Sequence, residues 1–81
     1  MEIKLFSKPV CMQCTATKRE LERRGMNFIE VDITKDEQVL RRIIALGYMQ
    51  ASVVMVGDDH WSGFRPEKIS ALANANLELV S

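Results

Sequence analysis

The sequence is poor in the residues that mark specialised classes of chain. It holds two cysteines, two prolines, four glycines and one histidine, and only 6% of its residues are aromatic. Two cysteines cannot build the dense disulfide framework of a small secreted domain. The scarcity of proline and glycine, without any repeat or linker, excludes collagen-like and low-complexity chains. Its 81 residues therefore predict one small domain over residues 1–81.

An excess of one charge and a long apolar run are also missing. Eleven basic and eleven acidic residues give a net charge of zero, whereas nucleic-acid binders usually show a basic excess or stripe. No apolar run approaches the roughly 20 residues of a membrane span, and residues 1–6 resemble a strand rather than a signal peptide. We therefore expect no nucleic-acid partner, no membrane association, a monomer and a cytoplasmic location.

The residues that are present indicate alternating strands and helices. Hydrophobic residues make up 47% and charged residues 27% of the chain, as in ordinary folded proteins. Residues 2–6 are predicted to form a buried strand, and residues 12–24 a helix that ends at Gly25. Ile29, Val31 and Ile33 alternate and predict a second strand with one apolar face over residues 28–33.

The second half continues the alternation. Thr34 and Glu37 fit a capping box that begins a second helix, and Gly47 marks its end. Residues 53–56 predict a third strand, and a short fourth strand starts at residues 60–61. Pro66 suits the first turn of a last helix, and residues 74–81 are expected to form a loose tail. The order β-α-β-α-β-β-α predicts an α/β fold with a four-stranded mixed sheet flanked by three helices.

Cys11-Met12-Gln13-Cys14 lies where the first strand meets the first helix. Residues three apart share a helix face, so the two sulfurs can form a disulfide. Unpaired N–H groups and the positive end of the helix dipole favour a thiolate at Cys11, while Cys14 lies one turn further in. We expect Cys11 to attack a target disulfide as the nucleophile and Cys14 to resolve the mixed disulfide. Lys8 either adds positive potential there or is an ordinary loop lysine.

A zinc site is the main alternative for the cysteine pair. Structural zinc usually needs four protein ligands, and two cysteines with one histidine do not complete such a site in a single chain. A metal or iron–sulfur centre shared by two chains through Cys11 and Cys14 remains open. His60, beside a polar turn, is expected to be solvated rather than catalytic.

Three segments together resemble one family. Residues 8–18, residues 47–50 and the run Trp61-Ser62-Gly63-Phe64-Arg65-Pro66 are similar to the NrdH-redoxins, glutaredoxin-like proteins with thioredoxin-like behaviour. The resemblance covers roughly residues 2–73 and implies a thioredoxin-like fold. It also implies a dithiol–disulfide oxidoreductase that donates electrons to the catalytic subunit of class Ib ribonucleotide reductase. Thioredoxin reductase would recharge it with NADPH bound to that enzyme, so no cofactor is expected on this chain, which lacks a Gly-X-Gly-X-X-Gly fingerprint.

The resemblance also suggests which residues meet partners. Ordinary glutaredoxins carry a Gly-Gly turn and acidic residues where this chain has Trp61, Phe64 and Arg65. The two aromatics would either cover the glutathione groove or simply fill core beside the hairpin. A glutathione-dependent glutaredoxin is therefore the alternative enzyme. The candidate partner-binding residues are Lys8, Met12, Gln13, Ala51, Ser52, Val53, Trp61, Phe64 and Arg65.

Ser52 departs from the family pattern, which places a cis-proline just before the third strand. A cis bond costs roughly 2.5–4 kcal/mol before serine but only about 0.5–1 kcal/mol before proline. We therefore expect either a trans Ala51–Ser52 bond with a reshaped loop or surroundings that impose the cis form. Weaker substrate docking, or easier access of a metal or a second chain to the thiols, would follow from the missing ring.

Overall fold

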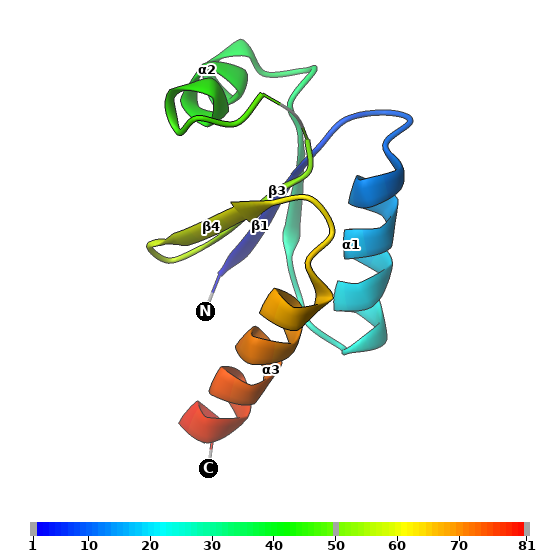
Figure 1. Ribbon diagram of the computed structural model, residues 1–81, viewed down its shortest axis with the longest axis vertical. Coiled ribbons are helices and arrows are strands. Elements are labelled where there is room, and N and C mark those ends of the chain that lie inside the picture. The colour runs from blue at the N-terminus through cyan, green and yellow to red at the C-terminus, as the bar shows by residue number, and fades with distance from the viewer. Residues whose placement is uncertain (1, 50, 81) are drawn as a thin grey trace.

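The computed structural model describes residues 2–49 and 51–80, with residues 75–80 as backbone only. Its elements follow the predicted order. They are β1 (Ile3–Ser7), α1 (Met12–Arg23), β2 (Ile29–Asp32), α2 (Glu37–Ala45), β3 (Val53–Val56), β4 (Asp59–Ser62) and α3 (Pro66–Val80). The predicted thioredoxin-like arrangement, a mixed four-stranded sheet with three helices, is confirmed (Figure 1).

The sheet has the strand order β2-β1-β3-β4. β1 and β2 are parallel and joined through α1, whereas β3 pairs antiparallel with both β1 and β4. Because β1 and β3 are central, their apolar residues are covered on both faces, as Leu5 and Val54 show by pairing at full burial. The carboxyl end of β1 and the amino end of β3 meet at one edge, since Phe6 pairs with Val53.

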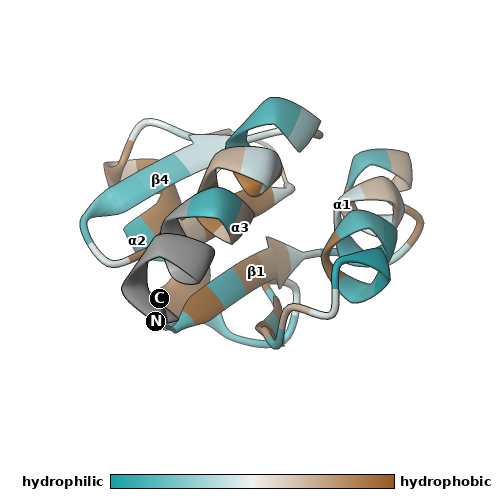
Figure 2. Ribbon diagram, turned by 90° about the horizontal axis from the view of Figure 1, so that it is seen from below, coloured by the Kyte–Doolittle hydropathy of each residue, from teal (hydrophilic) through white to brown (hydrophobic). Residues whose placement is uncertain are grey.

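Helices cover both faces of the sheet. One face packs against α1 and α3, which lie together on one side of the sheet in Figure 1, through Leu21 and Ile69. The other packs against α2 through Ile43, together with Phe6 and Ile33. Figure 2 shows hydrophobic colour along much of β1 and hydrophilic colour along most of α1. The buried residues of α1 are Cys14, Thr17 and Leu21, a helical spacing that puts one face inward.

The start of α2 differs from the prediction. Asp36, not Thr34, is the N-cap, and its carboxylate accepts hydrogen bonds from the backbone N–H groups of Gln38 and Val39 at 3.1 and 3.3 Å. Thr34 instead donates its hydroxyl to the Asp32 carboxylate at 2.6 Å. Asp36 serves as the N-cap because aspartate caps a helix at least as well as threonine does. The Thr34 hydroxyl is also already bonded within the preceding turn.

The structure adds detail to one expectation and corrects another. The apolar face of Ile29, Val31 and Ile33 is covered only in part: Ile29 is 49% exposed, because β2 is an edge strand and the cluster around α2 contains Val31 and Ile33 but not Ile29. The backbone of residues 74–80 is helical, as the last part of α3, where a loose tail was predicted. Helix-forming residues without glycine or proline in residues 67–80 account for this continuation. Ser81 lies outside the described residues.

Candidate active site

The cysteine pair is held by the turn from β1 into α1. Cys11 is the N-cap of α1, with extended backbone angles of −128° and 108°. Its sulfur accepts a hydrogen bond from the backbone N–H of Cys14 at 3.2 Å, and its carbonyl accepts one from the Thr15 N–H at 3.0 Å. The sulfur therefore takes the place that a capping oxygen usually fills, where negative charge is favoured.

Cys11 and Cys14 form a disulfide, as their spacing predicted, with their Cα atoms 5.2 Å apart. Their exposures differ: Cys14 is 4% exposed, whereas Cys11 is half-buried. An approaching thiolate can therefore reach Cys11 but not Cys14. The first turn of α1 contains no acidic residue, so no fixed negative charge on that turn opposes a thiolate at its cap.

Apolar side chains around the cysteines are exposed. Val10 and Met12, on either side of Cys11, are 102% and 90% exposed, and Met49 is also 90% exposed. The backbone of Val10 has φ 53°, a left-handed conformation that β-branched residues rarely adopt. Three large apolar side chains are therefore open to solvent around the cysteine turn and the segment before β3.

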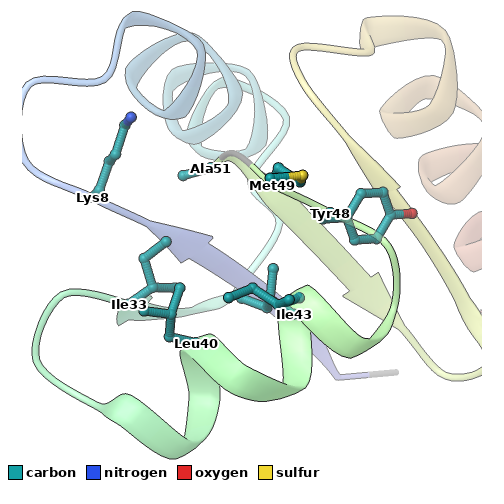
Figure 3. Close-up of a pocket in the computed structure, with 8 residues that line it drawn as sticks. Lys8, Ile33, Leu40, Ile43, Tyr48, Met49 and Ala51 are labelled. Atoms are coloured by element: carbon teal, nitrogen blue, oxygen red, sulfur yellow. The ribbon is translucent and has the colours of Figure 1, made fainter.

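An apolar groove runs beside this surface, between α2 and the segment that leads into β3 (Figure 3). Its volume is about 170 Å³. The lining residues are Lys8, Ile33, Leu40, Ile43, Ile44, Tyr48, Met49 and Ala51. Lys8 is the only charged residue among them, and it stands at the β1 end of the groove, where the chain turns toward Cys11.

The segment before β3 lies next to the cysteine turn. Ala51 packs in the buried cluster that contains Cys14, and Cys11 packs against the same cluster. Ala51, Ser52 and Val53 are all at most 6% exposed, so this segment offers a partner little accessible surface. The Ala51–Ser52 peptide bond is cis, which matches the second of the two arrangements expected for a serine at this position.

The hairpin residues divide into buried and exposed members. Trp61 is 4% exposed and belongs to the core between the sheet and α1 and α3, which matches the core-filling interpretation. Phe64 is 39% exposed, and Arg65 donates to the carboxylate of Glu67. Gly63, with φ +80°, donates its N–H to the Ser52 carbonyl at 2.9 Å. A Cβ atom at Gly63 would lie 3.7 Å from the Gln13 amide oxygen, so the segment reaches the cysteine turn here.

His60 is exposed and forms a contact that the sequence did not suggest. The hydroxyl of Tyr48 lies 2.6 Å from His60 Nδ1, and the two rings meet edge to face at 5.5 Å. This contact joins the segment after α2 to β4 beside the groove. It gives His60 a neighbour that accounts for its position without a catalytic role.

Sequence reasoning missed the groove residues on α2 and the segment after it. Ile44 and Met49 are 54% and 90% exposed, but nothing in a single sequence distinguishes an exposed apolar residue from a buried one. The one signal in the sequence was Gly47, because a glycine often ends a helix. In the structure Gly47 has φ +96° just after α2, and Tyr48 and Met49 follow it into the groove. Within residues 2–49 and 51–80, no group of three or more His, Cys, Asp or Glu side chains is placed to hold a metal ion. Over the same residues no helix is long and apolar enough to span a membrane.

Comparison with known proteins assigns this arrangement to a family. The family model for glutaredoxin matches residues 3–61. The glutaredoxin-like protein NrdH of Salmonella typhimurium is 45% identical over 74 residues, covering 89% of each chain. The NrdH proteins of Escherichia coli K12 and Lactococcus lactis are 39% and 32% identical, covering 89% and 88% of this chain and 89% and 99% of theirs. This chain belongs to the NrdH-type proteins of the glutaredoxin family.

The solved structures agree with this assignment. NrdH-redoxin from Escherichia coli, described as glutaredoxin-like with a thioredoxin-like activity profile, superimposes with a TM-score of 0.86 at 39% identity. The match covers 89% of this chain and 95% of that one. Glutaredoxin from Archaeoglobus fulgidus gives a TM-score of 0.77 at 26% identity, covering 86% and 83%. As an NrdH-type protein with a Cys11–Cys14 disulfide at a helix N-terminus, this chain is a thiol–disulfide redox protein.

Proposed function

We propose that this NrdH-type protein is a dithiol electron donor to the catalytic subunit of class Ib ribonucleotide reductase. The observation that carries the proposal is the half-buried Cys11 at the N-cap of α1, disulfide-bonded to the buried Cys14. Thioredoxin reductase would return it to the dithiol form, with NADPH bound to that enzyme and no cofactor on this chain. The oxidised and reduced forms would cycle in the cytoplasm, where reducing systems keep such pairs active.

The proposed cycle uses the two cysteines in turn. The Cys11 thiolate attacks one sulfur of the target disulfide, and the other target sulfur leaves as a thiolate that takes up a proton. Cys14 then loses its proton and attacks Cys11, which releases the second target sulfur and forms the Cys11–Cys14 disulfide. Two electrons pass from this chain to the target. The difference in burial supports these roles, because only Cys11 is open to a large partner.

The exposed apolar residues would form the docking surface. Val10, Met12, Met49 and Phe64 are exposed near the cysteine turn or the segments that contact it, and together they would cover the chain around the target disulfide. The groove beside Ala51 would take one apolar side chain of that target, with Lys8 placed for an acidic neighbour. Ala51, Ser52 and Val53 would support the site from within the core, and Gln13, which is exposed beside Gly63, would contact the target. Trp61 would affect binding only indirectly, from the core, whereas Arg65 would contact the target at the edge of the hairpin.

A coupled assay tests the proposal. Reduction of a protein disulfide by this chain should proceed with NADPH and thioredoxin reductase and should support turnover of a class Ib ribonucleotide reductase. Glutathione with glutathione reductase should replace the first system poorly. Efficient reduction by glutathione alone would favour a glutathione-dependent glutaredoxin. Stoichiometric metal in a dimer purified without oxygen would favour the centre shared between two chains.

A further inference from the structure

The hydroxyl of Ser52 is buried and forms no hydrogen bond to the described residues of the oxidised protein. The residue is 0% exposed, and its Oγ atom has no hydrogen-bond partner among the described residues. Folded proteins rarely leave a buried hydroxyl unpaired, because the group loses its bonds to water and gains none in return. An unpaired buried group of this kind calls for a state of the protein in which it finds a partner.

Two contacts hold Ser52 beside the cysteine turn. Its neighbour Ala51 packs in the cluster that contains Cys14. Its own carbonyl accepts the N–H of Gly63, and Gly63 in turn lies against the side chain of Gln13, between the two cysteines. The segment around Ser52 is thus fixed to the cysteine turn from both sides.

We propose that Ser52 is a positioning residue whose hydroxyl donates a hydrogen bond to the Cys14 sulfur once the disulfide opens. Cys14 is the better acceptor because its sulfur is buried like the hydroxyl, while the Cys11 sulfur already accepts the Cys14 N–H. A disulfide sulfur is a weak acceptor, but a thiolate forms a charge-assisted bond of roughly twice the strength of a neutral one. The inference deepens the proposed function, since it assumes that the disulfide cycles.

The redox step shows when the bond would form. An external thiolate attacks the Cys11 sulfur, the S–S bond breaks, and Cys14 leaves with the electron pair as a buried thiolate. A second external thiolate then releases Cys11, and the external pair becomes a disulfide while two electrons remain on this chain. Cys14 takes up a proton from solvent only where the pH is low enough to protonate it. The Ser52 hydroxyl would stabilise the Cys14 thiolate, both as the leaving group and in the reduced form while Cys14 is ionised, and it would not affect the oxidised form.

Ser52→Ala should therefore make the disulfide harder to reduce. We expect the equilibrium constant for reduction by dithiothreitol, measured by alkylation and mass spectrometry at alkaline pH where Cys14 is ionised, to fall about tenfold, which corresponds to about 30 mV. Ser62→Ala, an equivalent change on the neighbouring strand, should leave it unchanged. The melting temperature of the reduced Ser52→Ala protein should fall, while that of the oxidised protein should stay the same or rise, since an unpaired hydroxyl is lost.

A third measurement isolates Cys14. In Cys11→Ser protein, where Cys14 is the only thiol, adding Ser52→Ala should move the midpoint of the alkylation rate to higher pH. An unchanged equilibrium constant, the same shift in Ser62→Ala, or equal loss of stability in both redox forms would overturn the proposal. Reduction by dithiothreitol requires neither thioredoxin reductase nor a ribonucleotide reductase. Failure of the proposed electron route would therefore appear in the coupled assay and not in the dithiothreitol equilibrium.

Discussion

Cys11 and Cys14 lie one helical turn apart but in different surroundings. Cys11 stands at the open end of α1, and Cys14 is covered by Ala51, Phe6 and their neighbours. In the proposed cycle, this asymmetry would separate the attacking thiol of Cys11 from the resolving thiol of Cys14. It also makes the order of events testable with single substitutions.

Cys14→Ser should trap the target on Cys11, because no second thiol remains to release it. Cys11→Ser should abolish turnover and form no stable adduct with a protein disulfide, since Cys14 is 4% exposed. Non-reducing electrophoresis with the target subunit distinguishes the two. The Cys11→Ser, Cys14→Ser double variant is the control for non-specific adducts. An adduct that forms through Cys14 would reverse the assigned roles.

Trp61 and Phe64 test whether the hairpin aromatics serve packing or binding. Trp61→Ala should destabilise the protein by about 3–5 kcal/mol, because it empties a site in the core between the sheet and the helices. Phe64→Ala should cost far less stability, since Phe64 is 39% exposed, but should raise KM for the protein target several-fold. Urea unfolding and coupled kinetics measure the two effects. An increase in KM for Ile29→Ala, an exposed apolar residue on edge strand β2, would show that the effect is not specific to Phe64.

At the scale of elements, the cap of α2 matters because α2 forms one wall of the groove. Asp36→Ala should destabilise the protein by about 1 kcal/mol by leaving the Gln38 and Val39 N–H groups unpaired. Thr34→Ala, at the cap that the capping-box pattern predicts, should cost less, because Thr34 donates to Asp32 in the turn outside the helix. Chemical denaturation of both variants shows which of them loses more free energy of unfolding. Equal losses, or a larger loss for Thr34→Ala, would contradict the observed cap.

The same element shows how far sequence reasoning extends. All seven elements and their order were predictable, since the spacing of hydrophobic residues and the glycines and prolines at the ends of elements are local signals. The choice between Thr34 and Asp36 was not predictable, because two adequate caps lie two residues apart and the Thr34 hydroxyl is already bonded to Asp32 in the preceding turn. The exposure of Ile29 depends on which strand lies at the sheet edge, and a residue's own neighbours do not encode that.

At the scale of the whole molecule, the candidate site is a meeting of three segments far apart in the chain. The cysteine motif was recognisable because its four residues are contiguous, and the disulfide follows from their spacing. The groove combines Lys8, Ile33 and α2 with Tyr48, Met49 and Ala51, so it exists only after the sheet has assembled. The unpaired Ser52 hydroxyl likewise could not be anticipated, because burial and hydrogen-bond partners are properties of the folded chain.

The acid stability of the whole fold should depend on three carboxylates in different places, of which Glu67 is exposed and Glu20 and Asp32 are partly buried. Hydrogen bonds from the Arg23 and Arg24 side chains lower the pKa of Glu20, and the hydroxyl and N–H of Thr34 lower that of Asp32. Arg65 lowers the pKa of Glu67 in the first turn of α3. A carboxyl whose pKa is lower in the folded than in the unfolded chain stabilises the fold above its ordinary value of about 4. That contribution is lost as the pH falls through the lower folded value.

The urea midpoint of the oxidised protein should accordingly be level near neutral pH and should decline as the pH falls below about 4. Glu20→Gln should remove part of this decline and leave a lower plateau, because Arg23 and Arg24 then lose their shared partner on α1. Glu22→Gln is the matched control on the same helix, since Glu22 forms no ion pair within the described residues. Raised salt should flatten the curve of the parent protein, because these pairs are open to solvent. A midpoint that fell equally in Glu20→Gln and the parent protein would exclude Glu20 as a source of the pH dependence.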